Sequence, residues 1–155
     1  MRTGIGIDAH RFEAGRSMFL GGVEIETDKG LAGHSDADVL LHAIMDALLG
    51  ACGAGDVGEL FPDRDPAYKG ASSVDLLKRV HEEVQARGYA VVNVDAVVIC
   101  EEPRISPYRE RMRERIAHAL GVGTEAVSVK GTTTEGMGFA GRGEGVIAMA
   151  SVLIE

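Results

Sequence analysis

The chain lacks tryptophan, has few other aromatic residues and contains no long hydrophobic run. None of its apolar stretches reaches the roughly 20 residues that a membrane-spanning helix needs, which excludes a transmembrane helix. Basic residues are also scarce, with 16 lysines and arginines against 24 aspartates and glutamates and a net charge of −8. Because binding to nucleic-acid backbones needs clustered basic residues, we expect no nucleic-acid partner. A phosphorylated small molecule remains possible, since a metal ion or a few basic groups can hold it.

Cysteine is scarce too. The two cysteines, Cys52 and Cys100, lie in apolar surroundings and share no short motif. This pattern predicts reduced, buried thiols in a cytoplasmic protein. The N-terminal residues enter a strand pattern directly and show no signal peptide, which agrees with a cytoplasmic location. At 155 residues the chain has the length of one domain with a sizeable core, and we expect residues 1–155 to form a single domain.

Hydrophobic periodicity and turn residues divide the chain into alternating strands and helices. The predicted strands, among them a hairpin that turns at Gly21-Gly22, cover residues 2–12, 18–30, 89–100, 126–133 and 145–155. The predicted helices cover residues 35–53, 72–88 and 106–121, with loops at 53–70 and 134–145. Serines and glycines mark the helix ends, with caps at Ser35, Ser72 or Ser73, and Ser106, and stops at Gly53 or Gly55, Gly88 and Gly121. Strands that alternate with helices indicate an α/β sandwich in which helices pack on a sheet.

The first predicted strand carries a polar pair of unusual composition. In GIGIDAHRF, residues 4–12, the period of two places Asp8 and His10 on one face and Ile5 and Ile7 on the other. A carboxylate and an imidazole two residues apart on a strand are potential ligands of a transition metal. The strand therefore offers half of a candidate metal site.

The following helix supplies a third ligand, because Asp38, His42 and Asp46 recur at spacings of four and share one face. Asp8, His10 and His42 together make a two-histidine, one-carboxylate set, which leaves one coordination position open as in catalytic zinc sites. Manganese, iron or cobalt also accept such ligands. Each residue pattern is common by chance, so spacing alone leaves open that these side chains bind no metal.

Two segments carry residues suited to phosphate. His34 and Ser35 lie at the expected start of the metal-bearing helix, where free N–H groups and the helix dipole favour anions, although Ser35 also suits plain capping. KGTTTEG, residues 130–136, places Thr133 and Glu135 where a strand runs into a loop, and a carboxylate there suits a hard cation. A threonine run is equally normal in a strand. The nearby GFAGRGEG lacks the context of a dinucleotide motif or a P-loop.

Five segments together resemble one enzyme family. GIGIDAHRF, GLAGHSDADVLLHAIMDALLGA, GDVGELFPDRDP, VDAVVICEEPRISPY and VSVKGTTTEGMGFAGRGEG are similar in order and spacing to the 2-C-methyl-D-erythritol 2,4-cyclodiphosphate synthase family. The resemblance implies a homotrimer of α/β (α+β) catalytic domains, each a mixed β-sheet with helices packed on one face, with active sites in the clefts between neighbours. It implies a lyase of the non-mevalonate isoprenoid pathway that converts 4-diphosphocytidyl-2-C-methyl-D-erythritol 2-phosphate to the cyclodiphosphate. CMP is released in this metal-assisted intramolecular phosphoryl transfer.

The resemblance also implies residue roles. Asp8, His10 and His42 would bind Zn²⁺ or another divalent transition metal, and Glu135 would help to hold Mg²⁺ or Mn²⁺ bridging the substrate diphosphate. His34 and Thr133 would stabilise the transition state. The other substrate contacts would surround the phosphates, the methylerythritol or the cytidine, and come from Ser35, Asp56, Gly58, Phe61, Asp63, Cys100, Pro103, Arg104, Ile105, Ser106 and Thr132. Phe139 and Arg142, also expected to bind substrate, would lie toward the phosphate end or the trimer axis.

Two functions of other classes remain open at this point. A zinc hydrolase would use the open metal position to activate water and would release a linear phosphate. A trimeric nucleotide-binding sensor would use the metal only as a structural clip and would not turn over the cytidyl substrate.

Overall fold

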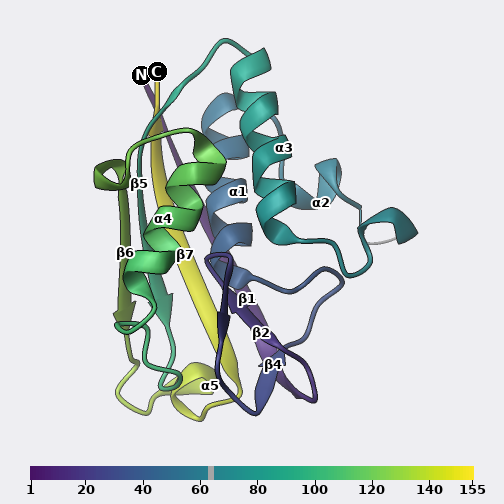
Figure 1. Ribbon diagram of the computed structural model, residues 1–155, viewed down its shortest axis with the longest axis vertical. Coiled ribbons are helices and arrows are strands. Elements are labelled where there is room, and N and C mark those ends of the chain that lie inside the picture. The colour runs from purple at the N-terminus through teal and green to yellow at the C-terminus, as the bar shows by residue number, and fades with distance from the viewer. Residues whose placement is uncertain (63–64) are drawn as a thin grey trace.

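The computed structural model describes residues 1–62 and 65–155 (Figure 1). The strands are β1 Arg2–Ala14, β2 Met18–Leu20, β3 Val23–Ile25, β4 Lys29–Leu31, β5 Val91–Ile99, β6 Val127–Thr132 and β7 Gly145–Ile154. The α-helices are α1 Val39–Cys52, α2 Val57–Leu60, α3 Ser73–Ala86, α4 Arg109–Leu120 and α5 Gly138–Gly141. Two short 3-10 helices lie at Pro66–Tyr68 and Thr124–Ala126.

The sheet is mixed, with the strand order β4-β1-β7-β5-β6. The two long strands β1 and β7 pair antiparallel from Arg2 opposite Ile154 to Arg11 opposite Gly145, so the two chain ends lie side by side. β5 and β6 run parallel, because α4 carries the chain back between them. β2 and β3 form a separate hairpin. The expected mixed sheet and the hairpin turn at Gly21-Gly22 are both confirmed.

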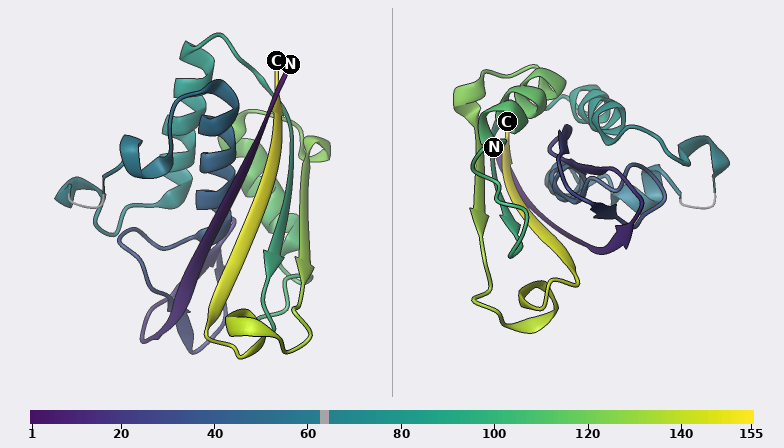
Figure 2. Two further views of the ribbon diagram at one scale, coloured as in Figure 1. Left: turned by 180° about the vertical axis from the view of Figure 1, so that it is seen from behind. Right: turned by 60° about the horizontal axis from the view of Figure 1, so that its bottom comes forward.

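The helices cover one face of the sheet, as expected. α1 packs on β1 and β7, α4 packs on β6, and α3 packs against both α1 and α4. Seen from its end, the sheet curls around α1 (Figure 2). On the opposite face, Ile5 and Ile7 are 67% and 57% exposed in the single chain. No helix in the described residues is both long and apolar enough to cross a membrane.

α1 is buried nearly all round. Among its residues only His42, Asp46 and Gly50, four residues apart, are not fully buried. Its contact with β1 is unusually close because Gly4 and Gly6 have no side chains: a Cβ on Gly6 would lie 2.0 Å from the Ala43 carbonyl oxygen. The same strand face then continues into Asp8 and His10, which brings these two side chains to the one uncovered stripe of α1.

The start of α3 after Ser72 is as expected, whereas the starts of α1 and α4 differ from the expected ones. α1 begins at Val39, and its cap is Asp38, whose carboxylate accepts a hydrogen bond from Leu41 N at 3.0 Å. Ser35 was the wrong cap, because Ala37 takes a left-handed conformation (φ 58°) that keeps residues 35–37 out of the helix. The fully buried Asp38 carboxylate therefore lies at the N-terminus of α1.

Ser106 is likewise not a helix cap. Residues 106–108 form a turn in which Tyr108 N donates to Ile105 O, and α4 starts after it. The predicted stops at Gly53 and Gly121 are confirmed, and both glycines take the left-handed conformation of a C-cap. The expected loops 53–70 and 134–145 contain the short helices α2 and α5, each only four residues long. Helices this short leave no apolar period in the sequence.

Candidate functional site

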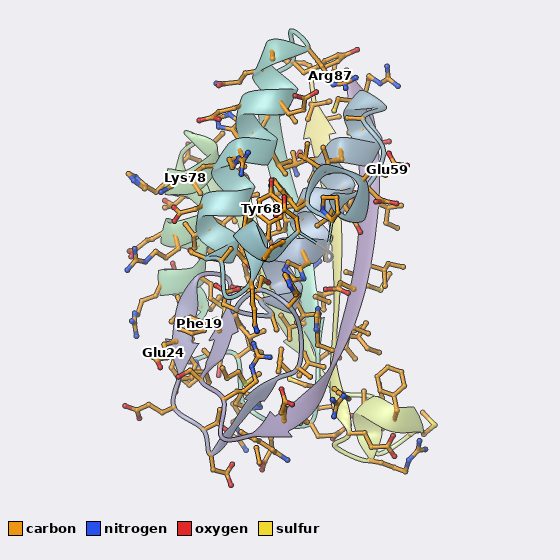
Figure 3. The ribbon with its side chains drawn as sticks, turned by 90° about the vertical axis from the view of Figure 1, so that its right-hand side faces the viewer. Phe19, Glu24, Glu59, Tyr68, Lys78 and Arg87 are labelled. Carbon is orange, nitrogen blue, oxygen red and sulfur yellow. The ribbon has the colours of Figure 1, made fainter. Side chains whose placement is uncertain are left out.

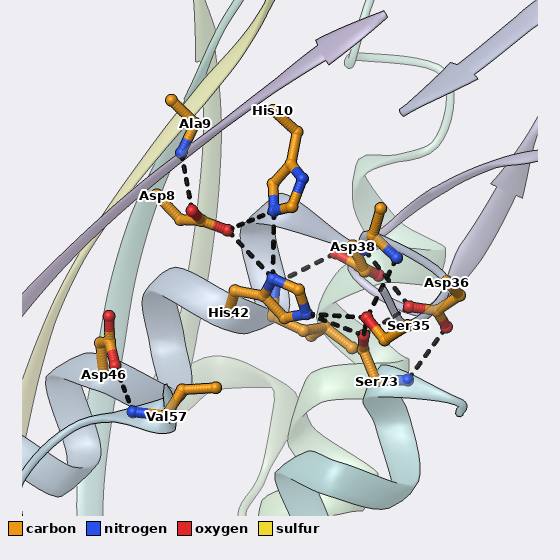
Figure 4. A network of polar contacts seen from close by, with 12 residues as sticks. Asp8, Ala9, His10, Ser35, Asp36, Asp38, His42, Asp46, Val57 and Ser73 are labelled. Atoms are coloured by element: carbon orange, nitrogen blue, oxygen red, sulfur yellow. Dashed lines mark hydrogen bonds and ion pairs between the residues drawn. The ribbon is translucent and has the colours of Figure 1, made fainter. Parts of the chain in front are cut away.

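β1 and α1 bring Asp8, His10 and His42 together, as the sequence predicts. Asp8 Oδ2 lies 2.8 Å from His10 Nε2 and 3.0 Å from His42 Nδ1, and the two ring nitrogens are 3.3 Å apart (Figure 4). All three side chains are half-buried. The other carboxylate oxygen of Asp8 accepts a hydrogen bond from Ala9 N at 2.8 Å.

The outer nitrogen of each imidazole has its own partner. His10 Nδ1 contacts the Ala32 carbonyl oxygen, which can only accept, so this nitrogen carries the proton. His42 Nε2 lies 3.1 Å from Ser35 Oγ and 3.2 Å from Ser73 Oγ. When His10 Nδ1 and His42 Nε2 are both protonated, the lone pairs of His10 Nε2 and His42 Nδ1 converge with Asp8 Oδ2. Such an arrangement requires a positive charge at its centre.

A tetrahedral zinc ion fits this donor set. With zinc–nitrogen bonds near 2.0–2.1 Å, two ligand atoms of a tetrahedron lie about 3.3 Å apart. The observed separation of His10 Nε2 and His42 Nδ1 is 3.3 Å, whereas Asp8 Oδ2 lies closer to them, at the hydrogen-bond distances of 2.8 and 3.0 Å. The hydrogen bonds on the outer nitrogens are the kind that orient metal-binding histidines. Asp8, His10 and His42 are therefore suited to hold a divalent metal.

In the absence of a metal, a proton on a histidine supplies the positive charge beside the Asp8 carboxylate. Burial raises the pKa of Asp8, but hydrogen bonds from His10 and His42 outweigh it and leave the pKa below its usual range. Burial lowers the pKa of His10, but the hydrogen bond to Asp8 outweighs it and the pKa is raised. A proton on His10 thus competes with a metal ion for the same lone pair.

A cavity of about 350 Å³ lies beside these three ligands. Its lining includes most of the residues expected around the phosphates and the methylerythritol, namely His34, Ser35, Asp56, Gly58 and Phe61. Asp46, Tyr68 and Leu76, which were not predicted, also line it. Tyr68 lies against α3 (Figure 3), and its ring centroid is 5.2 Å from that of Phe61. Asp63, also predicted, lies outside the described residues.

The residues expected around cytidine gather elsewhere. A pocket of about 180 Å³ at the ends of β5 and β6 is lined by the predicted residues Cys100, Pro103, Arg104, Ile105, Ser106, Thr132 and Thr133. Thr133 Oγ donates to the Glu135 carboxylate at 3.1 Å, and Glu135 takes a left-handed conformation (φ 53°). Among the described residues, none lines both this pocket and the cavity beside Asp8, His10 and His42, which we call the metal-side cavity. Within one chain, Thr133 therefore lines the pocket at the ends of β5 and β6, and it does not line the cavity beside the metal ligands.

The last two predicted residues lie apart from both pockets. Phe139 is 42% exposed. Arg142 pairs with Glu144 at 2.6 Å and lines a groove of about 410 Å³ together with Phe12 and Lys29.

Both expected thiols are confirmed as free and buried, and burial raises the pKa of Cys100 to about 11.

Asp46 and Arg16 hold the shape of the metal-side cavity, a role that the sequence patterns do not predict. Asp46 accepts from Val57 N at 2.9 Å and so ties α2 to α1, and burial together with the charges of Asp56 and Asp8 raises its pKa. Arg16 donates to the carbonyl oxygens of Gly33 and Ser35 at 2.8 and 2.9 Å, on either side of His34. These contacts span 11 to 19 residues of sequence, and no local pattern reports them.

Residues 1–155 match the family described as the YgbB family. The chain is 58% identical over 154 residues to the 2-C-methyl-D-erythritol 2,4-cyclodiphosphate synthase of Moorella thermoacetica, a match that covers 99% of this chain and 94% of that protein. It is 57% identical over 155 residues to the protein of the same name from Chloroherpeton thalassium, covering 100% and 99%.

Solved structures of similarly named proteins share the fold of this chain. The bifunctional IspDF from Campylobacter jejuni superposes with a TM-score of 0.95 at 42% identity, over 99% of this chain and 42% of that longer chain. A 2C-methyl-D-erythritol-2,4-cyclodiphosphate synthase in its CDP-bound form superposes with a TM-score of 0.91 at 34% identity, over 99% and 100%.

Proposed function

The chain belongs to the YgbB family, whose curated members include 2-C-methyl-D-erythritol 2,4-cyclodiphosphate synthases, and from this membership we propose how its residues act. The reaction converts 4-diphosphocytidyl-2-C-methyl-D-erythritol 2-phosphate to the cyclodiphosphate. An oxygen of the 2-phosphate bonds to the β-phosphorus, the bond from that phosphorus to the bridging oxygen breaks, and the bridging oxygen leaves with CMP. The nucleophile belongs to the substrate, so the protein has to position groups and stabilise charge.

Asp8, His10 and His42 would hold Zn²⁺ or another divalent transition metal, as their donor atoms and distances support. A bound zinc ion would polarise a phosphoryl oxygen and fix the diphosphate for in-line attack. Glu135 would help to hold Mg²⁺ or Mn²⁺, for which a carboxylate oxygen is a suitable ligand.

His34 and Ser35 border the metal-side cavity and would bind phosphate oxygens there. Arg16 holds both carbonyls that flank His34, and this keeps the imidazole at the cavity rim. Asp56, Gly58 and Phe61 line the same cavity and would enclose the methylerythritol, whose hydroxyl groups suit the Asp56 carboxylate. Asp63 would join them.

Thr132, Thr133 and the segment from Cys100 to Ser106 would hold the cytidine and the distal phosphates. Because their pocket and the metal-side cavity share no lining residue, a substrate that contacts both needs them to come from neighbouring chains. A homotrimer with its active sites between subunits meets this need. The exposed Ile5 and Ile7 support assembly, since a contiguous apolar face is normally covered by a partner. Light scattering is expected to give the mass of a trimer, and a monomer mass at micromolar concentration would refute the assembly.

The two buried free thiols, Cys52 and Cys100, agree with a reducing compartment, and we place the enzyme in the cytoplasm. The substrate is a small molecule, and no nucleic-acid or membrane partner is proposed.

The convergence of three metal-binding atoms beside a cavity lined by His34 and Asp56 carries this proposal most strongly. The test incubates purified protein with the cytidyl substrate and identifies the products. Equal amounts of CMP and cyclic diphosphate are expected. A linear phosphate product would instead identify a hydrolase, and binding without turnover would identify a sensor.

A further inference from the structure

We propose that Asp36 and Ser73 are positioning residues that fix which nitrogen of His42 carries the proton, and thereby set the affinity of the site for its metal. The inference rests on the metal site proposed above. It concerns the far side of the His42 ring, away from Asp8 and His10, where the contacts form a chain from His42 through Ser73 to Asp36. We call this chain the Asp36–Ser73 relay.

The relay is short and enclosed (Figure 4). Ser73 is fully buried, and its Oγ lies 3.2 Å from His42 Nε2. The same hydroxyl contacts Asp36 Oδ1, and the Ser73 amide donates to Asp36 Oδ2 at 2.9 Å. Ser35 Oγ lies 3.1 Å from His42 Nε2 and accepts from Ala37 N at 3.2 Å.

The direction of the hydrogen bonds follows from the number of protons available. A carboxylate can only accept, so the single hydroxyl proton of Ser73 goes to Asp36. Ser73 Oγ then presents lone pairs to His42 Nε2 and to Ser35 Oγ, which lies 3.4 Å from it. When the Ser35 hydroxyl donates to Ser73, both serine oxygens accept from His42 Nε2, and that nitrogen carries the proton. A neutral imidazole has one N–H, so Nδ1 keeps its lone pair and faces Asp8 and His10 as a metal ligand. Asp36 therefore selects the tautomer that binds metal.

A competing tautomer makes this selection necessary. His42 Nδ1 lies 3.0 Å from Asp8 Oδ2, and in the metal-free protein Asp8 favours a proton on Nδ1. A proton there occupies the lone pair that a metal would use. The Asp36–Ser73 relay opposes Asp8 from the other side of the ring and keeps the metal-binding lone pair free.

The backbone is arranged to deliver Asp36 to this position. The backbone of Ala37 is in the left-handed conformation, which is uncommon for residues other than glycine. The turn separates its neighbours: Asp38 points back to cap α1, while Asp36 reaches the first residue of α3. α3 has Ser72 as its N-cap, and Ser72 makes no side-chain cap bond. Asp36 could therefore have a purely structural role, as the cap of α3. An experiment has to distinguish this role from the relay.

Ser73→Ala separates the two explanations. It removes the hydroxyl but keeps the amide that donates to Asp36 Oδ2, so the cap of α3 is retained. The control is Ser72→Ala, which removes an exposed hydroxyl one residue away that makes no cap bond. Asp36→Asn is the second variant, because its amide can donate to Ser73 and reverse the direction of the relay.

The experiment measures zinc affinity by competition with a chromogenic chelator, and the His42 tautomer by ¹⁵N NMR of histidine-labelled, metal-free protein at pH 8.5. For the wild type we expect the proton on Nε2. In Ser73→Ala and Asp36→Asn we expect a gain of the Nδ1–H tautomer and a zinc affinity lower by about tenfold to a hundredfold, the usual effect of removing such a partner. Ser72→Ala should match the wild type in both measurements.

Several outcomes would overturn the relay. A wild-type His42 with its proton on Nδ1 does so without any variant. Loss of zinc affinity with no change of tautomer would assign a structural role, and unchanged affinity in either folded variant would remove the relay. A wild type that does not bind zinc refutes the metal site itself, which distinguishes failure of the proposed function from failure of this inference.

Discussion

Gly6→Ala tests whether the close contact between β1 and α1 builds the metal site. Gly6 lies two residues before Asp8 on the same strand face, and its neighbour across the contact, Ala43, directly follows His42. A Cβ at Gly6 would lie 2.0 Å from the Ala43 carbonyl oxygen and 2.7 Å from Ala47 N. Both atoms are backbone of a buried helix, so no side chain can rotate away to make room.

The size of the effect follows from these distances. Cβ contacts closer than 3.0 Å essentially never occur, so β1 and α1 must separate locally by about 1 Å. Metal–ligand distances tolerate only about 0.2 Å. Because Asp8 and His10 move with β1 and His42 moves with α1, we expect Gly6→Ala to lose stoichiometric zinc binding. Overpacking of this kind costs about 1–3 kcal/mol, which for a chain of this length lowers the melting temperature by about 2–12 °C.

The assay combines elemental analysis of purified protein with thermal unfolding of the metal-free form. Gly50→Ala is the matched control, since Gly50 lies on the exposed side of α1 and a Cβ there meets nothing within 4 Å. That substitution should retain zinc and stabilise the helix by about 0.5–1 kcal/mol. If Gly6→Ala bound zinc and unfolded like the wild type, the close contact would have no role in building the site.

Three further predictions concern the site itself. His42→Ala should remove most bound zinc and most activity while the fold survives, because His42 is only half-buried; full zinc occupancy by elemental analysis would refute its assignment. Thr133→Val keeps the side-chain shape but deletes a hydroxyl donor, so kcat should fall about a hundredfold with KM and zinc content nearly unchanged; a normal kcat would remove Thr133 from the catalytic residues. Burial lowers the pKa of His10, but the hydrogen bond to Asp8 outweighs it and the pKa is raised. Because a metal binds only the neutral ring, zinc should bind more weakly at pH 6 than at pH 8. Competition with a chelator measures this, and equal affinities at the two pH values would contradict it. The same shift stabilises the metal-free protein fully below the unfolded value of 6.5, and this stabilisation is lost as pH rises through the raised pKa of His10.

Local patterns in the sequence were enough to select Asp8, His10 and His42 as candidate metal ligands and to place the main elements. The period of two in β1 places Asp8 and His10 on one face, and spacing along α1 turns His42 away from its apolar positions. The hairpin glycines and the C-cap at Gly53 were equally readable, because a left-handed backbone favours glycine wherever it occurs. Family resemblance added the substrate and the grouping of residues into pockets, which periodicity alone does not contain.

Contacts between distant segments were decided only by the tertiary structure. The alternation in β1 does not say which face meets the helices, and it is the glycine face with Asp8 that packs while Ile5 stays exposed. Asp38 caps the helix in place of Ser35, and its carboxylate also accepts hydrogen bonds from Gly21 N and Gly22 N of the hairpin, 17 and 16 residues away. The link from Asp36 to Ser73 spans 37 residues. Sequence determines which residues share a face or end a helix because those properties depend on neighbours along the chain, whereas the partner of each buried polar group depends on which segments packing brings together.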